Sequence, residues 1–162
     1  MRIARDGTWF HEGKPIRRPA MVQLFSSILM RGPAEGKEGE KGESLEYFLV
    51  TPVEKVRIQV EDCPMVVNQM EVLESHENQQ ILFTTNTDET LTSDKDHRIE
   101  VTSSGSSNEP HPIVHVRSGL NALINRAVFY RLVEAGEERK IDGRNVLGVW
   151  SAGEFFSLGS AD

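Results

Sequence analysis

The order of apolar and polar positions predicts an amphipathic helix near the start of the chain. Apolar residues recur at positions 21, 22, 25, 28 and 29, a spacing that places side chains on one face of a helix. Pro19 suits the first helical position, because its missing amide proton costs nothing there. Gly32 and Pro33 end the pattern. We therefore expect a helix that begins at Pro19 and includes Leu29.

Short apolar runs predict strands along much of the rest of the chain. Trp9 and Phe10 predict a first strand, which a turn at Gly13 follows. Further strands are expected at 47–50, 56–61, 70–73, 80–84, 97–101 and 113–117, and a final hairpin at 146–150 and 155–158. Polar turns between the middle strands are typical of an antiparallel meander. The run 32–46 is rich in Gly, Glu and Lys and is predicted to be a surface loop.

A second amphipathic helix is predicted in the C-terminal half. Ser118 or Asn121 would cap it, and apolar residues follow at helical spacing at positions 120, 123, 124, 127 and 130. At an offset of 108 residues this helix aligns with the first, so that Arg18 meets Arg126 near the start of both. The alignment indicates either a repeated strand–helix–strand unit or the likeness that any two amphipathic helices share. The residues alone leave both interpretations open.

Composition narrows the class of protein. A length of 162 residues suits one domain or two small ones. No apolar run approaches the roughly 18 residues of a membrane span, and the first residues lack the apolar segment of a signal peptide. We therefore expect a cytoplasmic protein without a membrane span. The formal net charge of −7 argues against general nucleic-acid binding, which needs a basic surface.

The chain lacks the common catalytic and metal-binding motifs, so we expect neither an enzyme nor a cofactor. His111 and His115 are four residues apart, but Pro112 and its β-branched neighbours predict a strand. Four residues along a strand span about 13 Å, too far for one metal ion. Cys63, the single cysteine, follows Asp62 and is predicted to be an inert turn residue. A hydrolase or transferase of unrecognised type stays an open alternative.

Basic residues on the expected helices and strands, near aromatic side chains, are candidates for ligand binding. Arginine grips a phosphate with two parallel hydrogen bonds, and an aromatic ring can stack on a base. The competing interpretation is a set of solvated cations in surface ion pairs, each of which contributes little. The candidates are Arg18, Lys55, Arg57, Arg117 and Arg126 for phosphate contacts, with Trp9 or Tyr130 for stacking.

Four stretches of the chain carry a family resemblance: residues 6–18, 47–56, 125–133 and 148–159. Together they resemble the bacterial family known as domain of unknown function 1285, over nearly the whole chain. The resemblance implies an α+β fold of two small related domains, each with a helix packed on an antiparallel sheet. It implies that the second domain is superficially similar to pleckstrin-homology domains. It also implies a nucleotide-type ligand at the domain interface and a role in signal transduction.

These observations lead to one leading hypothesis and one alternative. We expect two domains, residues 1–64 and 65–162, that hold a small anionic, nucleotide-like ligand between them without catalysis. A signalling protein is a second expected partner. The alternative is a protein–protein interaction adaptor without a small-molecule ligand. A sheet edge or the aromatic C-terminal hairpin would then be its docking surface.

Overall fold

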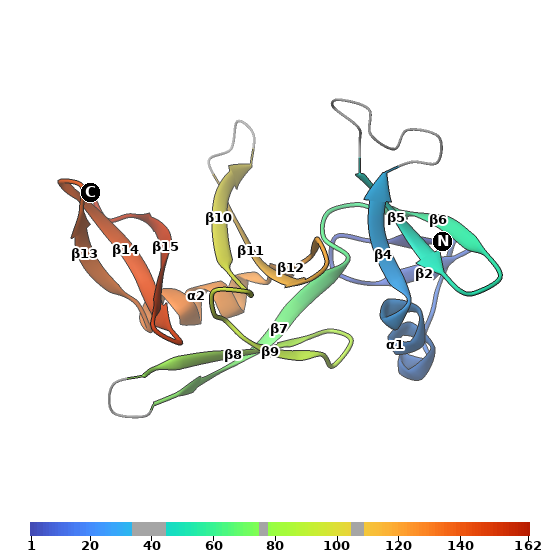
Figure 1. The fold of residues 1–162 in the computed structure, drawn as a ribbon, viewed down its shortest axis with the longest axis horizontal. Coiled ribbons are helices and arrows are strands. Elements are labelled where there is room, and N and C mark those ends of the chain that lie inside the picture. Colours follow the sequence, from blue (N-terminus) through green and yellow to red (C-terminus); the bar gives the residue numbers. More distant parts are fainter. Residues whose placement is uncertain (34–44, 75–77, 105–108) are drawn as a thin grey trace. The chain divides into compact units, whose positions relative to one another are not determined.

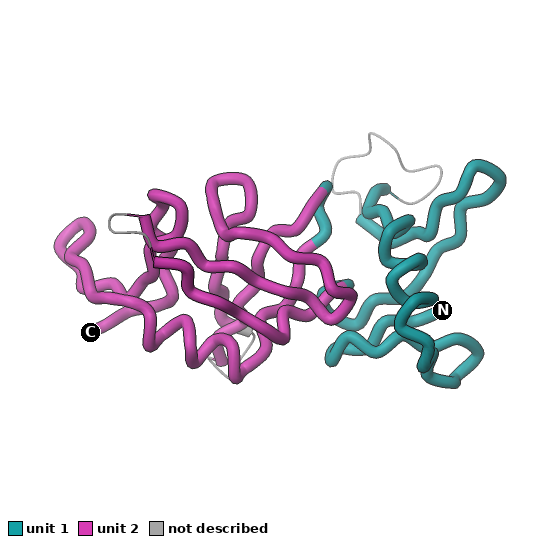
Figure 2. Tube along the Cα trace, turned by 90° about the horizontal axis from the view of Figure 1, so that it is seen from below, with its two compact units in different colours: residues 1–64, 118–120 teal, residues 65–117, 121–162 magenta. Residues whose placement is uncertain are grey.

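The computed structural model of the protein describes residues 1–33, 45–74, 78–104 and 109–162, which fall into two units (Figure 2). Unit 1 comprises residues 1–64 and 118–120, and unit 2 comprises residues 65–117 and 121–162. The described residues contain two helices of nine residues each, α1 (Pro19–Ser27) and α2 (Arg126–Glu134), among many strands (Figure 1). Neither helix is long and apolar enough to span a membrane.

Unit 1 is built on a six-stranded sheet. Its strands are β1 (Arg2–Ile3), β2 (Trp9–His11), β3 (Lys14–Pro15), β4 (Leu29–Pro33), β5 (Leu45–Val50) and β6 (Lys55–Val60). They lie in the order β3-β2-β1-β6-β5-β4, and neighbouring strands are antiparallel except for the parallel pair of β1 and β6. The core of this unit contains Ile3, Trp9, Leu29 and Ile58, each less than 5% exposed.

Unit 2 contains a six-stranded and a three-stranded sheet. The larger sheet has β7 (Met65–Leu73), β8 (Gln80–Thr85), β9 (Thr90–Thr92), β10 (Ile99–Ser104), β11 (Glu109–Arg117) and β12 (Leu120–Ile124). Its order is β10-β11-β12-β7-β8-β9, with β12 parallel to β7. The smaller sheet has β13 (Glu137–Ile141), β14 (Arg144–Ser151) and β15 (Glu154–Ser160), in that order and antiparallel.

A buried hydroxyl joins the two sheets of unit 2. The Oγ of Ser151, at the end of β14, accepts a hydrogen bond from the amide of Ile81 on β8 at 2.9 Å. It donates to the carbonyl oxygen of Ser93 at 2.6 Å. Ser151 is 0% exposed, and its hydroxyl therefore satisfies backbone groups that would otherwise be buried without a partner.

The first helix begins at Pro19 as predicted, but its predicted end is wrong. It stops at Ser27, and Leu29 starts strand β4, where it pairs with Leu49 and is 1% exposed. Pairing with β5 overrides the helical spacing of Leu29, because the strand satisfies its backbone and buries its side chain together. Gly32 and Pro33 belong to this strand too. Of the loop expected at 32–46, both ends are therefore strand, and 34–44 lie outside the described residues.

The second helix begins later than predicted, so Ser118 and Asn121 are wrong as caps. Residues 120–124 form strand β12, in which Leu120, Ala122 and Ile124 are buried and the residues between them are half-buried. This is the period of two that a strand requires. The cap of α2 is Asn125, one residue before the helix.

The strand predictions are largely confirmed, and the antiparallel meander predicted for the middle strands is confirmed in part, since β7, β8 and β9 pair in sequence order whereas β10 pairs with β11. The final hairpin forms as β14 and β15, and 56–61 and 80–84 correspond closely to β6 and β8. Two strand pairs are parallel, β1 with β6 and β7 with β12. Strand β13 was not predicted, because all five of its residues are exposed and no apolar alternation marks it.

Candidate functional site

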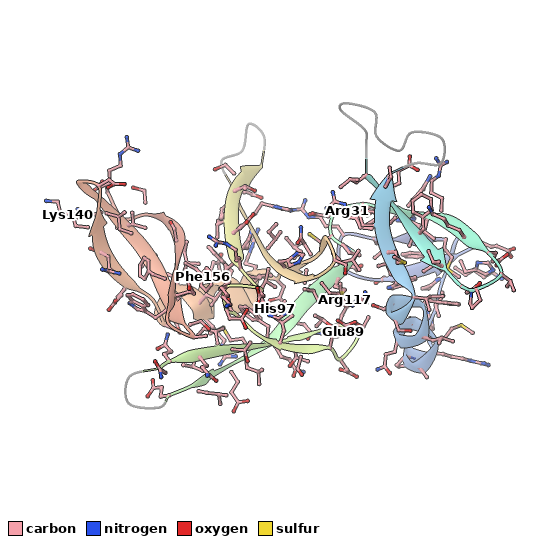
Figure 3. The ribbon with its side chains drawn as sticks, in the orientation of Figure 1. Arg31, Glu89, His97, Arg117, Lys140 and Phe156 are labelled. Atoms are coloured by element: carbon pink, nitrogen blue, oxygen red, sulfur yellow. The ribbon has the colours of Figure 1, made fainter. Side chains whose placement is uncertain are left out.

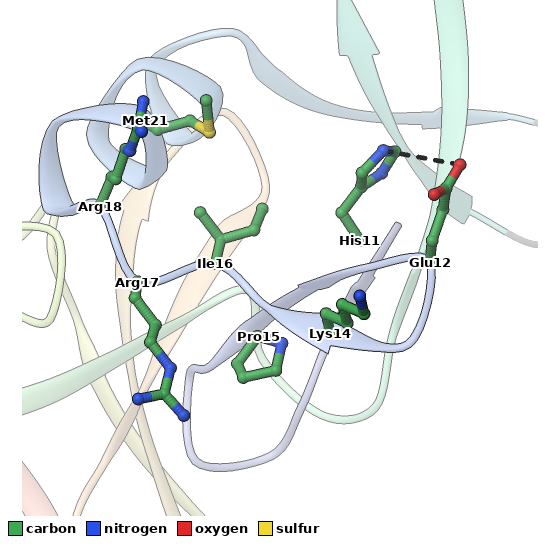
Figure 4. A pocket seen from close by; sticks show the side chains of 8 residues that line it. All are labelled: His11, Glu12, Lys14, Pro15, Ile16, Arg17, Arg18 and Met21. Atoms are coloured by element: carbon green, nitrogen blue, oxygen red, sulfur yellow. Dashed lines mark ion pairs between the residues drawn. The ribbon is translucent and has the colours of Figure 1, made fainter.

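A pocket of about 340 Å³ opens in unit 1 beside the start of α1, and we call it the α1 pocket (Figure 4). The β2–β3 hairpin, the segment that follows it and the first turn of α1 form its wall. The lining residues are His11, Glu12, Lys14, Pro15, Ile16, Arg17, Arg18 and Met21. Its volume lies at the lower end of the range of roughly 300–1,000 Å³ that is usual for small-molecule sites.

The turn of the β2–β3 hairpin sets the geometry of one side of this pocket. Glu12 and Gly13 have φ angles of 50° and 79°, and two consecutive left-handed residues are the signature of a type I′ turn. This turn pairs His11 directly with Lys14 across the hairpin. The amide of Ile16 then donates to the Trp9 carbonyl oxygen at 2.8 Å and holds the segment that leads to α1.

The start of α1 carries positive charge that no side chain of the helix neutralises. The residue at its N-cap is Arg18, which makes no side-chain capping bond, and the first turn contains no acidic residue. The first amide groups of a helix give that end a partial positive charge, which Asp or Ser at the N-cap ordinarily offsets. Here an arginine stands in that place and adds to the charge.

Three basic side chains of the α1 pocket are without an acidic partner in the described part of the chain. Lys14, Arg17 and Arg18 are all exposed, and none forms an ion pair or side-chain hydrogen bond there. The acidic residue of the lining, Glu12, lies 3.9 Å from His11 (Oε1 to Nε2). In Figure 4, the Arg17 guanidinium points away from Met21, so the three cations surround the pocket rather than meet at one point.

A second pocket in unit 1, of about 420 Å³, lies where β1, β2 and β6 come together. Its lining residues are Met1, Arg2, Phe10, Glu12, Gly13, Arg57, Ile58 and Gln59. Both of its arginines have acidic partners: Arg2 pairs with Glu61, and Arg57 lies 3.5 Å from Glu46. Arg2 also lies over the Phe10 ring, 4.3 Å from its centroid. An anion here would have to compete with these carboxylates, which makes the α1 pocket the better anion site.

The candidate residues of unit 1 do not gather in one place. Arg18 lines the α1 pocket and Arg57 the second pocket, while the Lys55 ammonium lies 4.2 Å from the Phe48 ring centroid. Trp9 is 1% exposed and its ring stacks on Phe25 with centroids 6.1 Å apart. In this arrangement Trp9 is part of the core and presents no face to a ligand.

The candidate residues of unit 2 lie on β11 and α2. Arg117 is paired with Glu89 at 3.2 Å (Figure 3). Arg126 is the first residue of α2 and is exposed, and Tyr130, 59% exposed, follows it by four residues. Residues four apart share one face of a helix, so Arg126 and Tyr130 form an exposed pair.

Sequence reasoning selected Arg18 but not its neighbours in the pocket. Lys14, Arg17 and His11 were not among the candidates, although three basic residues between positions 14 and 18 were visible in the sequence. The signal would have been a turn at Gly13 followed within five residues by Lys14, Arg17 and Arg18 and then by a helix-starting proline, because such a turn brings residues on both sides of it together.

Cys63 is unsuited to nucleophilic chemistry at neutral pH. Burial, followed by the nearby Asp62 carboxylate, raises the pKa of its thiol to about 12. The thiol lies 3.6 Å from Oδ1 of Asp62, to which it donates. Because the thiolate is the reactive form of cysteine, this side chain stays protonated and inert in the folded protein.

Comparison with known proteins identifies relatives by sequence and by structure. Residues 1–63 match the model "Domain of unknown function (DUF1285), N-terminal domain", and residues 64–158 match "Protein of unknown function (DUF1285), C-terminal domain". The structure is similar to the crystal structure of a DUF1285 family protein from Silicibacter pomeroyi DSS-3. The TM-score is 0.83 and the identity 45%, over 99% of this chain and 80% of that one.

A second solved structure is more distant. It is a DUF1285 family protein from Shewanella baltica OS155, with a TM-score of 0.58 and 26% identity, over 82% of this chain and 89% of that one. No curated protein matches the chain.

Proposed function

Because the chain belongs to the DUF1285 family, whose description names no ligand, we propose a function from the chemistry of the α1 pocket: a non-enzymatic module that binds a small phosphate-bearing ligand. The observation that carries the proposal is the group of cations Lys14, Arg17 and Arg18, which have no acidic partner among the described residues, around one pocket of a chain whose net charge is −7. Nucleotides are one member of this ligand class.

Phosphate suits this site better than a neutral ligand does. Guanidinium groups bind phosphate oxygens with charge-assisted hydrogen bonds, which are roughly twice as strong as neutral ones. The start of α1 adds its own positive end, and no acidic side chain of the helix offsets it. An anion bound there would supply the negative charge that the N-cap residue does not.

The test is titration with inorganic phosphate and with adenosine monophosphate, followed by amide chemical shifts in NMR spectra. Saturable shifts are expected for residues 14–21. Arg18→Ala should weaken binding about tenfold, which corresponds to ~1.4 kcal/mol. Arg144→Ala is the matched control, because Arg144 is also exposed but lies at the start of β14, outside the pocket lining. Absence of saturable shifts, or equal losses in both variants, would refute the proposal.

Several finer expectations belong to the same proposal. They are the signalling role, the cytoplasmic location, the helix-on-sheet architecture of both domains, the pleckstrin-homology likeness of the second domain, and ligand contacts outside the α1 pocket, made by Lys55 and Arg57 in unit 1 and by Arg117, Arg126 and Tyr130 in unit 2. The buried Trp9 is excluded from these contacts. The signalling role and the pleckstrin-homology likeness rest only on what the resemblance of the sequence implies. Arg126 and Tyr130 are exposed, which supports ligand contacts by these two residues. Arg117 is paired with Glu89, which makes a ligand contact by Arg117 less favourable.

The alternative, a protein–protein adaptor, receives less support from the C-terminal hairpin. Trp150 packs edge-on against Phe155 with centroids 5.2 Å apart, and the Arg139 guanidinium covers both rings at 5.0 and 5.3 Å. The indole nitrogen of Trp150 donates to Glu137 at 2.6 Å. These aromatics are engaged within the chain, and the charged edge strand β13 discourages the addition of another strand.

A further inference from the structure

The α1 pocket has an apolar part as well as a basic one. Pro15, Ile16 and Met21 line it alongside the cations. In Figure 4 the Ile16 side chain points toward Met21, on the side of the chain opposite to the Arg17 guanidinium. Met21 is 40% exposed and Ile16 is partly exposed, so both leave apolar surface in water that a ligand could cover.

The apolar part is aliphatic rather than aromatic. None of the eight lining residues is Phe, Tyr or Trp, and the nearby Trp9 is inside the core. The imidazole of His11 lies beside the Glu12 carboxylate. Stacking on aromatic side chains contributes to the binding of a nucleobase, and the lining of this pocket contains no Phe, Tyr or Trp for it to stack on. An alkyl chain needs only apolar area.

We infer that the α1 pocket takes an aliphatic phosphate monoester, with the phosphate at Arg18 and the start of α1 and the alkyl chain against Ile16 and Met21. This inference rests on the proposed function and names its ligand class more narrowly. A soluble alkyl phosphate and the headgroup of phosphatidic acid share this chemistry.

The experiment compares probes of one series: inorganic phosphate, methyl phosphate, propyl phosphate and hexyl phosphate. Each added methylene that the pocket covers should tighten binding by up to about fourfold, until the pocket is full. Hexanol controls for apolar adsorption without the anion, and adenosine monophosphate for a base in place of the alkyl chain. Hexyl phosphate should bind more tightly than any other probe.

A matched pair of variants locates the alkyl site. Met21→Gln should flatten the dependence of affinity on chain length. Leu24→Gln lies one turn further along α1, outside the pocket lining, and should alter neither that dependence nor the affinity for inorganic phosphate. Leu24 is 61% exposed and Met21 40%, so neither substitution disturbs the core. An equal effect of the two variants on the chain-length series would contradict the inference.

The remaining outcomes separate the two claims. If inorganic phosphate and hexyl phosphate bind equally well, or adenosine monophosphate binds best, the alkyl site is refuted and the proposed function stands. If no phosphate-bearing probe binds, both fail. Sedimentation with phosphatidylcholine vesicles, with and without phosphatidic acid, distinguishes the sources. If the protein cosediments only with vesicles that contain phosphatidic acid, the ligand is the lipid headgroup. If the protein binds hexyl phosphate but does not cosediment with these vesicles, the ligand is a soluble ester.

Discussion

The two helices of this protein have the same length and differ in almost everything else. The amide of Val128 donates to the side chain of Asn125 at 2.9 Å, which caps α2, and Val128 and Leu132 are buried. Helix α1 has an arginine at its N-cap without a capping bond, and Ser26 is its one buried residue. Helix α2 thus satisfies its backbone and fills a core, while α1 does little of either.

The difference indicates that α2 stabilises the fold, whereas the start of α1 leaves charged groups exposed to solvent. Arg131 in the last turn of α2 donates to the Met70 carbonyl oxygen at 2.8 Å, so even its cation is used within the fold. The cations at the start of α1 have no such use among the described residues. A group that destabilises the folded chain without a compensating contact within it is often part of a functional site. The start of α1 is such a place, and we therefore expect ligand binding there.

The largest expected effect is the loss of a buried leucine from α2. Leu132 is 0% exposed, and Leu132→Ala should lower the free energy of unfolding by about 3 kcal/mol, because it leaves a cavity that the surroundings cannot fill. Urea denaturation measures this change. A loss below about 1 kcal/mol would show that α2 is not part of the core in the way its burial indicates.

The cap of α2 should have the next largest effect. Asn125→Ala removes the acceptor for the Val128 amide and should cost about 1 kcal/mol of unfolding free energy. Asn125→Asp keeps an acceptor and serves as the control, with stability close to that of the unchanged protein. Equal losses in both variants, again measured in urea, would mean that the side-chain bond is not what matters.

The opposite sign is expected at the cap of α1. Arg18→Asp supplies the missing acceptor and a favourable charge at the positive end of the helix. It should raise the unfolding free energy by about 0.5 kcal/mol and abolish phosphate binding in the NMR titration. Arg18→Ala should leave stability nearly unchanged, since there is no capping bond to lose. A destabilised Arg18→Asp protein would contradict this account of α1.

The smallest effect is expected on the outer face of α1. Leu24 is 61% exposed, so Leu24→Ala should change the unfolding free energy by less than about 0.5 kcal/mol, as is usual for surface positions. Thermal and urea unfolding together would detect a larger change. A loss close to that of Leu132→Ala would remove the contrast between the two helices.

Sequence patterns predict correctly those elements that depend only on residues close together in the chain. Pro19 marks the start of α1 because a missing amide is harmless at one helical position. The hairpin of β14 and β15 follows from apolar runs on both sides of a Gly-containing turn. The predicted end of α1 and start of α2 are wrong because strands β4 and β12 form by pairing with β5 and β7, and no local pattern reveals which strands pair.

The site was predictable only in part, for a similar reason. Arg18 stood out by its place before a helix, but its grouping with Lys14 depends on the turn at Glu12 and Gly13. In that turn Glu12 adopts a φ of 50°, a conformation that Asn or Asp favours more than glutamate. A Glu-Gly pair is therefore a weaker sign of such a turn than Asn-Gly.

The parallel pairing of β7 with β12 has a consequence for synthesis of the chain. Strand β8 follows β7 directly and pairs with it as an antiparallel neighbour, but the other edge, at residues 65–67, pairs with Ala122, Leu123 and Ile124. As the chain emerges from the ribosome, this apolar edge stays open until β12 has been made. Open edges recruit strands from other chains, and pairing between distant segments forms slowly. This edge of β7 is therefore a place where nascent unit 2 is expected to aggregate before β12 has been made.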